Sequence, residues 1–95
     1  MLTCKLTSPE LRIRKEQVIA ALKSRILETC EVHNGFEYKF ESTDDMLDQL
    51  NEFIKSERLC CDFFDFTISL KKETVWLAIN GPEGAKEFIK AELEL

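Results

Sequence analysis

Two adjacent cysteines, Cys60 and Cys61, are the residues of this chain whose type and spacing are best suited to chemistry. The Cα atoms of neighbouring residues lie about 3.8 Å apart, which is below the usual disulfide range, so a bond between the two sulfurs would be strained. Two thiolates can instead hold a soft or borderline metal ion. Glu57 and Asp62 are close enough in sequence to supply a carboxylate ligand.

The position of the cysteine pair favours metal binding over catalysis. Both cysteines follow a predicted helix, whose C-terminal end carries partial negative charge. This charge favours a bound cation and disfavours a reactive thiolate, and nearby Glu57 and Asp62 act in the same direction. The single histidine, His33, falls in a predicted exposed turn, so no Cys/His catalytic pair is expected. The sequence therefore favours a non-enzymatic protein with a vicinal-thiol site for zinc, another thiophilic metal ion or a thiol-reactive ligand.

Core packing is an alternative explanation of the same residues. Free cysteine is among the most buried residue types and behaves as a small hydrophobe, so Cys60 and Cys61 could simply fill space. Glu57 could then pair with Arg58. Under this interpretation the function is protein interaction, because Phe63 and Trp76 are expected on the sheet face opposite the helices. A homodimer is the simplest form of such an interaction.

Composition predicts one small cytoplasmic domain. The chain has 95 residues, of which 44% are hydrophobic and 33% charged, and no linker or repeat divides it, so a single domain over residues 1–95 is expected. No apolar run approaches the roughly 20 residues that span a bilayer, and the N-terminus lacks a secretory signal. In a reducing cytoplasm Cys4 and Cys30 are also expected to be free thiols, and either could add a third sulfur only if the fold brings it near the pair.

The charge distribution argues against nucleic acid as a partner. The formal net charge of −5 repels a phosphate backbone. The nearest approach to a basic patch is Arg12, Arg14 and Lys15, which we expect to form a solvated helix face.

Hydrophobic patterning predicts the elements of the first half of the chain. Residues 2–7 alternate as a short strand, and Ser8-Pro9 is typical of a helix start, with the helix extending to about Arg25. Residues 28–41 predict a hairpin around Asn34-Gly35. A three-residue loop over residues 33–35, with a left-handed glycine, would place Cys30 opposite Tyr38 on an apolar face.

A second helix is predicted to begin at Ser42, which would act as its cap. Its apolar stripe is formed by Met46, Leu47, Leu50, Phe53 and Ile54. Continuing that stripe by one heptad predicts that Glu57, Cys60 and Cys61 also face inward.

Two further strands are predicted over residues 63–80. Their alternating patterns match if residues 71–74 form the loop, since Leu70 then opposes Val75 and Phe66 opposes Ile79. Gly81-Pro82-Glu83 predicts the start of a last helix. Together the elements predict an α+β two-layer sandwich, in which two hairpins and the N-terminal strand form an antiparallel sheet that three helices cover on one face.

The chain also resembles a family of small bacterial proteins over nearly its whole length. That family carries an E-R-x-C-C-P-F junction and a W-L-x-x-x-G-P-E-G-x-K-E-F ending, and this sequence has ERLCCDFF and WLAINGPEGAKEF. The matching residues are Glu57, Arg58, Cys60, Cys61, Phe63, Trp76, Leu77, Gly81, Pro82, Glu83, Gly84 and Phe88. Asp62 stands where the family usually has proline, which removes a sharp helix stop and adds a carboxylate. The family has no established activity that the resemblance could carry over.

Overall fold

The computed structural model describes residues 9–60 and 63–93. The elements in chain order are α1 (Pro9–Lys23), β1 (Glu28–Val32), β2 (Gly35–Glu41), α2 (Asp44–Cys60), β3 (Asp65–Lys71), β4 (Thr74–Asn80), α3 (Ala85–Phe88) and the π-helical turn η1 (Ile89–Leu93). This order confirms the predicted α+β class. The strand predicted over residues 2–7 lies outside the described residues.

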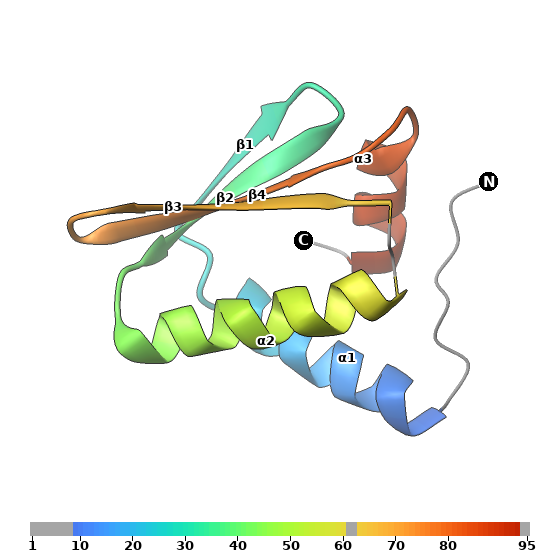
Figure 1. The fold of residues 1–95 in the computed structure, drawn as a ribbon, viewed down its shortest axis with the longest axis horizontal. Helices are drawn as coiled ribbons and strands as arrows, with labels where there is room; N and C mark the ends of the chain where they lie inside the picture. Colours follow the sequence, from blue (N-terminus) through green and yellow to red (C-terminus); the bar gives the residue numbers. More distant parts are fainter. Residues whose placement is uncertain (1–8, 61–62, 94–95) are drawn as a thin grey trace.

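The sheet has four antiparallel strands in the order β1-β2-β4-β3 (Figure 1). The two hairpins, β1–β2 and β3–β4, are therefore joined through their second strands, and among the described strands β1 and β3 lie at the two edges. Each hairpin follows a helix, so α1-β1-β2 and α2-β3-β4 are two successive units of the same helix-hairpin type.

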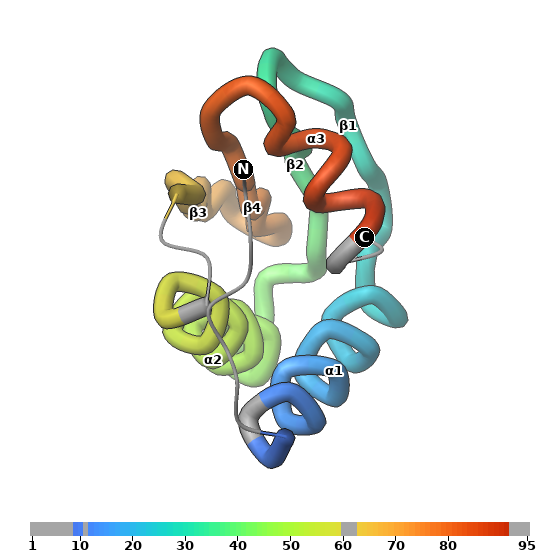
Figure 2. Tube along the Cα trace, turned by 90° about the vertical axis from the view of Figure 1, so that its right-hand side faces the viewer, coloured from blue at the N-terminus to red at the C-terminus, as the bar shows by residue number. Residues whose placement is uncertain are grey.

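One face of the sheet and the helices enclose the core. Helices α1 and α2 run next to each other along this side, while α3 and η1 stand at one end of the sheet (Figures 1 and 2). The helices α1, α2 and α3, the turn η1 and the central strands β2 and β4 all contribute to one buried cluster. Its residues are Ile19, Leu22, Phe36, Tyr38, Phe40, Met46, Leu50, Phe53, Phe64, Val75, Leu77, Ile79, Ala85 and Ile89. Among the described residues, no helix is long and apolar enough to cross a membrane.

The register of the second hairpin agrees with the sequence prediction. Leu70 pairs with Val75 and Phe66 pairs with Ile79. The strands continue to the pair Lys71–Thr74, which leaves Lys72 and Glu73 as the turn, and Lys72 has a positive φ of 48°.

The predicted register of the first hairpin is wrong by one position. Val32 pairs with Gly35 and Cys30 pairs with Glu37, so the turn consists of His33 and Asn34. Asn34, with φ 58°, is the left-handed residue of this turn instead of Gly35. Glycine is required at position 35 for another reason, because a Cβ there would overlap the carbonyl oxygen of Ile79 in the neighbouring strand.

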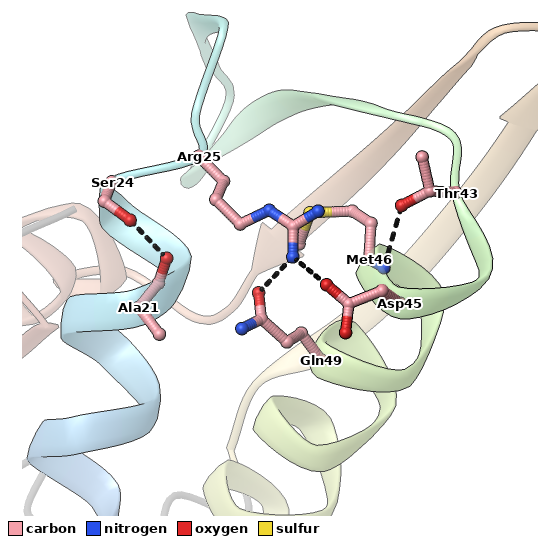
Figure 3. Close-up of polar contacts among 7 residues, drawn as sticks. All are labelled: Ala21, Ser24, Arg25, Thr43, Asp45, Met46 and Gln49. Carbon is pink, nitrogen blue, oxygen red and sulfur yellow. Dashed lines mark hydrogen bonds and ion pairs between the residues drawn. The ribbon is translucent and has the colours of Figure 1, made fainter.

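The helix ends also differ in detail from the predicted ones. Thr43, and not Ser42, caps α2, because its Oγ1 accepts a hydrogen bond from the Met46 amide at 3.1 Å (Figure 3). Helix α3 begins at Ala85, after Gly84 has adopted a left-handed φ of 95°. The bend at residues 82–84 therefore precedes the helix that was predicted to begin there.

Arg14 of α1 and Arg25, which follows α1, connect this part of the chain to α2. Arg25 donates to Asp45 Oδ2 at 2.6 Å and to Gln49 Oε1 at 3.1 Å (Figure 3). Near the other end of α1, Arg14 lies 3.2 Å from Glu52. These contacts lie along the first half of α2 and join it to α1 and the residues that follow α1.

Candidate functional site

A buried carboxylate occupies the last turn of α2. Glu57 has no exposed side-chain surface, which confirms the prediction that the apolar stripe of α2 carries this carboxylate inward. Its spacing explains the burial, because Leu50, Phe53 and Glu57 follow one another at intervals of three and four residues on the same helix face.

The cation facing Glu57 is Lys15 of α1. Lys15 Nζ lies 3.7 Å from Glu57 Oε1, and the side chain of Lys15 is 9% exposed. Arg58, the partner suggested by the sequence, is exposed and forms no ion pair with Glu57 in the part of the chain that the structure describes. Two helices from different parts of the sequence thus bring opposite charges together inside the protein.

The prediction of a solvated face at Arg12, Arg14 and Lys15 is wrong for Lys15. Arg12 and Arg14 are exposed, whereas Lys15 is buried. The sequence contains a signal for this difference, since Lys15 precedes Ile19 by four residues and therefore lies on the buried stripe of α1. The missed residue is therefore a cation that lies beside Glu57.

The cysteine pair follows Glu57 at the end of α2. Cys60 is the last residue of the helix, so the first of the two cysteines stands where the helix ends. The side chain of Cys60 and the whole of Cys61, Asp62 and Cys4 lie outside what the structure describes. Among the described residues, no group of three or more histidine, cysteine, aspartate or glutamate side chains could hold a metal ion.

Cys30 does not lie in the core, contrary to the prediction. The register of β1 places Cys30 beside Glu37, on the sheet face turned away from the helices, where its free thiol is half-buried. The sheet therefore separates Cys30 from Glu57 on the helical side. Cys30 does not supply the third sulfur that the sequence left open.

Trp76 lies on this open face of the sheet, as predicted. Its neighbours across the strands are Lys39 of β2 and Ser69 of β3. Lys39 Nζ lies 5.9 Å from the centroid of the Trp76 ring, within the range of a cation–π interaction. A shallow hollow of about 270 Å³ beside the ring is lined by Cys30, Glu37, Ser69, Lys71 and Trp76.

Phe63 does not share the open face with Trp76. It precedes β3, and its ring packs 4.6 Å from that of Phe64 and 5.1 Å from that of Phe88, between centroids. The alternation that predicted its direction begins only at Asp65, where the strand starts. Phe63 therefore belongs to the aromatic cluster at the end of the core.

His33 lies in the exposed turn of the first hairpin, as predicted. Burial raises the pKa of Tyr38, whereas a hydrogen bond from Lys86 and its positive charge lower the pKa of Glu31. The structure thus gives His33 no partner for acid–base chemistry among the residues described here.

A second hollow, of about 300 Å³, lies between α1 and α2. It is lined by Gln17, Val18, Ala21, Asp45, Asp48, Gln49 and Glu52. Arg25 and Arg14 already pair with Asp45 and Glu52, so much of its acidic lining is engaged in holding the helices together.

Comparison of the chain with protein-family models, with curated proteins and with solved structures found no match.

Proposed function

We propose that the protein binds a soft metal ion or another thiol-reactive ligand through Cys60 and Cys61, with Glu57 as the supporting carboxylate. The observation that carries this proposal is the complete burial of Glu57 in the last turn of the helix that ends at Cys60. Charged side chains are seldom buried unless they are paired, and buried charges concentrate at functional sites. The proposal is non-enzymatic and includes a cytoplasmic setting, where the thiols stay reduced.

The electrostatics at the end of α2 support a cation in this position. The C-terminal carbonyl groups of a helix carry partial negative charge, and α2 is long enough, from Asp44 to Cys60, to develop it fully. Two thiolates prefer zinc, copper(I) or similar ions. Lys15 neutralises Glu57 when no metal is bound, so loading the site would exchange one positive partner of this carboxylate for another.

The test is a titration of the reduced full-length chain with Zn(II), Cu(I) and an arsenical, followed by native mass spectrometry. We expect one equivalent to bind and binding to be lost in the Cys60→Ser/Cys61→Ser variant. Cys30→Ser is the matched control, because it removes a half-buried thiol on the other side of the sheet. Binding that persists in the double variant, or no binding by the wild type, would reject the proposal.

The second candidate function is protein interaction through the open face. Its support is the position of Trp76 beside a hollow in the middle of an otherwise polar sheet surface. If a homodimer forms through this face, Trp76→Ala should raise the dissociation constant measured by sedimentation. The net charge of −5 continues to favour proteins over nucleic acids as partners.

The proposed family relationship is independent of either function. We infer it from the two motifs, which include the cysteine pair and Trp76. Joint conservation of Glu57 and Lys15 in an alignment of many sequences would support a common site.

A further inference from the structure

Among the described residues, no strand pairs with the outer edge of β3. This strand is the last in the order β1-β2-β4-β3, and six of its seven residues are exposed. Such an edge presents unpaired backbone groups that can pair with another strand, unless charges, proline or a covering segment prevent it. The sequence DFTISLK has charged residues only at its two ends and contains no proline.

The side chains of β3 also leave an apolar surface uncovered. Phe66 begins this surface under α2, where its ring meets that of Phe53 at 6.1 Å. Ile68 and Leu70 follow on the same face, but they are 42% and 59% exposed. The apolar face of the core therefore continues into solvent at this edge, and contiguous exposed apolar surface is typical of interaction sites.

The sequence of β3 complements itself when the strand is reversed. With Ile68 opposite Ile68 of a second copy, Asp65 meets the second Lys71 and Phe66 meets the second Leu70. Thr67 and Ser69 then face each other on the open side of the sheet. Because alternate residues share a face, this register aligns acid with base, apolar with apolar and hydroxyl with hydroxyl.

We propose that two copies of this chain pair antiparallel through β3 and form a symmetric dimer with a continuous eight-stranded sheet. The twofold axis passes next to Ile68, and the apolar residues of both strands form one stripe on the helical side. Among the described residues, Asp65 and Lys71 make no ion pair within the single chain, so both are available for the partner. This dimer does not depend on the proposed thiol site.

The other edge explains why the assembly stops at two copies. Strand β1 carries Glu28 and Glu31, which already pair with Lys39 and Lys86. Antiparallel pairing of two β1 strands would bring these carboxylates close to one another and is therefore opposed. An interface that pairs β3 with β3 uses the same patch on both molecules and closes on itself.

Charge exchange tests this register directly. Sedimentation velocity of the reduced full-length chain over a series of concentrations should show a monomer–dimer equilibrium at moderate salt. Asp65→Lys and Lys71→Asp should each raise the dissociation constant roughly tenfold or more, because each places like charges opposite each other at both ends of the interface. An equimolar mixture of the two variants should recover the dimer, since every pair across their common interface is again of opposite charge.

Controls on other exposed apolar and aromatic residues separate this edge from the rest of the surface. Ile68→Lys should abolish the dimer, whereas Ile13→Lys, at a side chain that is 55% exposed on α1, should not. Trp76→Ala distinguishes this dimer from one through the open face of the sheet, because only the open-face dimer should be weakened. Circular dichroism identifies any variant that fails to fold. If Ile68→Lys fails to fold, mixing Asp65→Lys with Lys71→Asp decides whether the dimer forms through β3. A wild type that stays monomeric, or a mixture that stays as weak as its components, would overturn the proposal.

Discussion

The phenol of Tyr38 is the clearest case of a polar atom that the fold buries without compensation. The side chain is fully buried in β2, and within residues 9–60 and 63–93 its hydroxyl has no hydrogen-bond partner. Removing such a hydroxyl eliminates a desolvation cost. We expect Tyr38→Phe to stabilise the protein by about 1 kcal/mol in urea unfolding at neutral pH. A loss of stability would contradict this explanation.

The pH dependence of the same variant has a definite sign. Burial raises the pKa of Tyr38 above its ordinary value of 10.0, so in alkaline solution the unfolded chain releases this proton first. Below pH 10 the ionisation of Tyr38 leaves the free energy of unfolding unchanged. Above pH 10 it lowers the free energy of unfolding, by at most about 1.4 kcal/mol per pH unit. The wild type should therefore lose stability above pH 10 more steeply than Tyr38→Phe. Parallel curves would show that Tyr38 ionises equally in both states.

Glu57 has the opposite character, because its burial is compensated by Lys15. Breaking a buried ion pair from one side leaves a charge behind, so Glu57→Gln should destabilise the protein by about 3–5 kcal/mol in urea unfolding. The double variant Lys15→Met/Glu57→Gln should recover part of this loss. If the losses of stability in Lys15→Met and Glu57→Gln add up to the loss in the double variant, the two side chains are not coupled in solution.

These residues also mark what the sequence can and cannot predict at this scale. The inward direction of Glu57 followed from heptad spacing, and the position of Trp76 followed from the alternation of its strand. Lys15 lay on an equally regular stripe, but its positive charge led to the opposite conclusion. A lysine is usually exposed, and only the three-dimensional approach of α1 to α2 shows which one has a buried partner.

At the scale of elements, the cap of α2 deserves a direct test. Thr43 accepts the Met46 amide proton at the first turn, and Asp44 and Asp45 add negative charge near the positive end of the helix. Thr43→Ala should destabilise the protein by about 1 kcal/mol in urea unfolding, whereas Ser42→Ala should have a smaller effect. Equal effects would show that the cap is shared between the two hydroxyls.

The ion pair between β1 and α3 gives a second prediction for the elements. Lys86 lies 3.0 Å from Glu31 and lowers the pKa of that carboxyl below its ordinary value of 4.5. The resulting stabilisation is present above pH 4.5 and is lost as the pH falls through the lower, folded-state pKa. Thermal unfolding of Lys86→Ala and the wild type should therefore differ at pH 7 and converge in acid. A difference that persists in acid would point to lost packing instead.

The elements were predicted more accurately than the registers of their turns. Alternation identified all four described strands. The register of the second hairpin was predicted correctly because the apolar residues of its two strands lie on one face in that alignment. The first hairpin was wrong because its loop was chosen to align Cys30 with Tyr38 on one apolar face. Gly35 instead belongs to β2, where it allows the close approach of Ile79. That requirement comes from β4, which is distant in sequence, and so has no local signal.

At the scale of the whole molecule, the sequence predicted the class but not the strand order. Hairpins follow from local patterns, whereas the pairing of β2 with β4 joins the two helix-hairpin units and depends on the core between them. The proposed thiol site and the proposed dimer edge both belong to the second unit, at the end of α2 and along β3. A ligand at the helix end and a partner at the edge can therefore be tested separately.

The central pairing of β2 with β4 also has a kinetic consequence. Each hairpin closes over a turn of two residues, but Phe36 must find Ile79, which lies 43 residues further along the chain. Closing such a long loop costs entropy before any contact compensates it, so non-local pairing limits the folding rate. We expect refolding to be slowed most by substitutions along the β2–β4 seam, since the chain crosses its main barrier when the two preformed halves meet there.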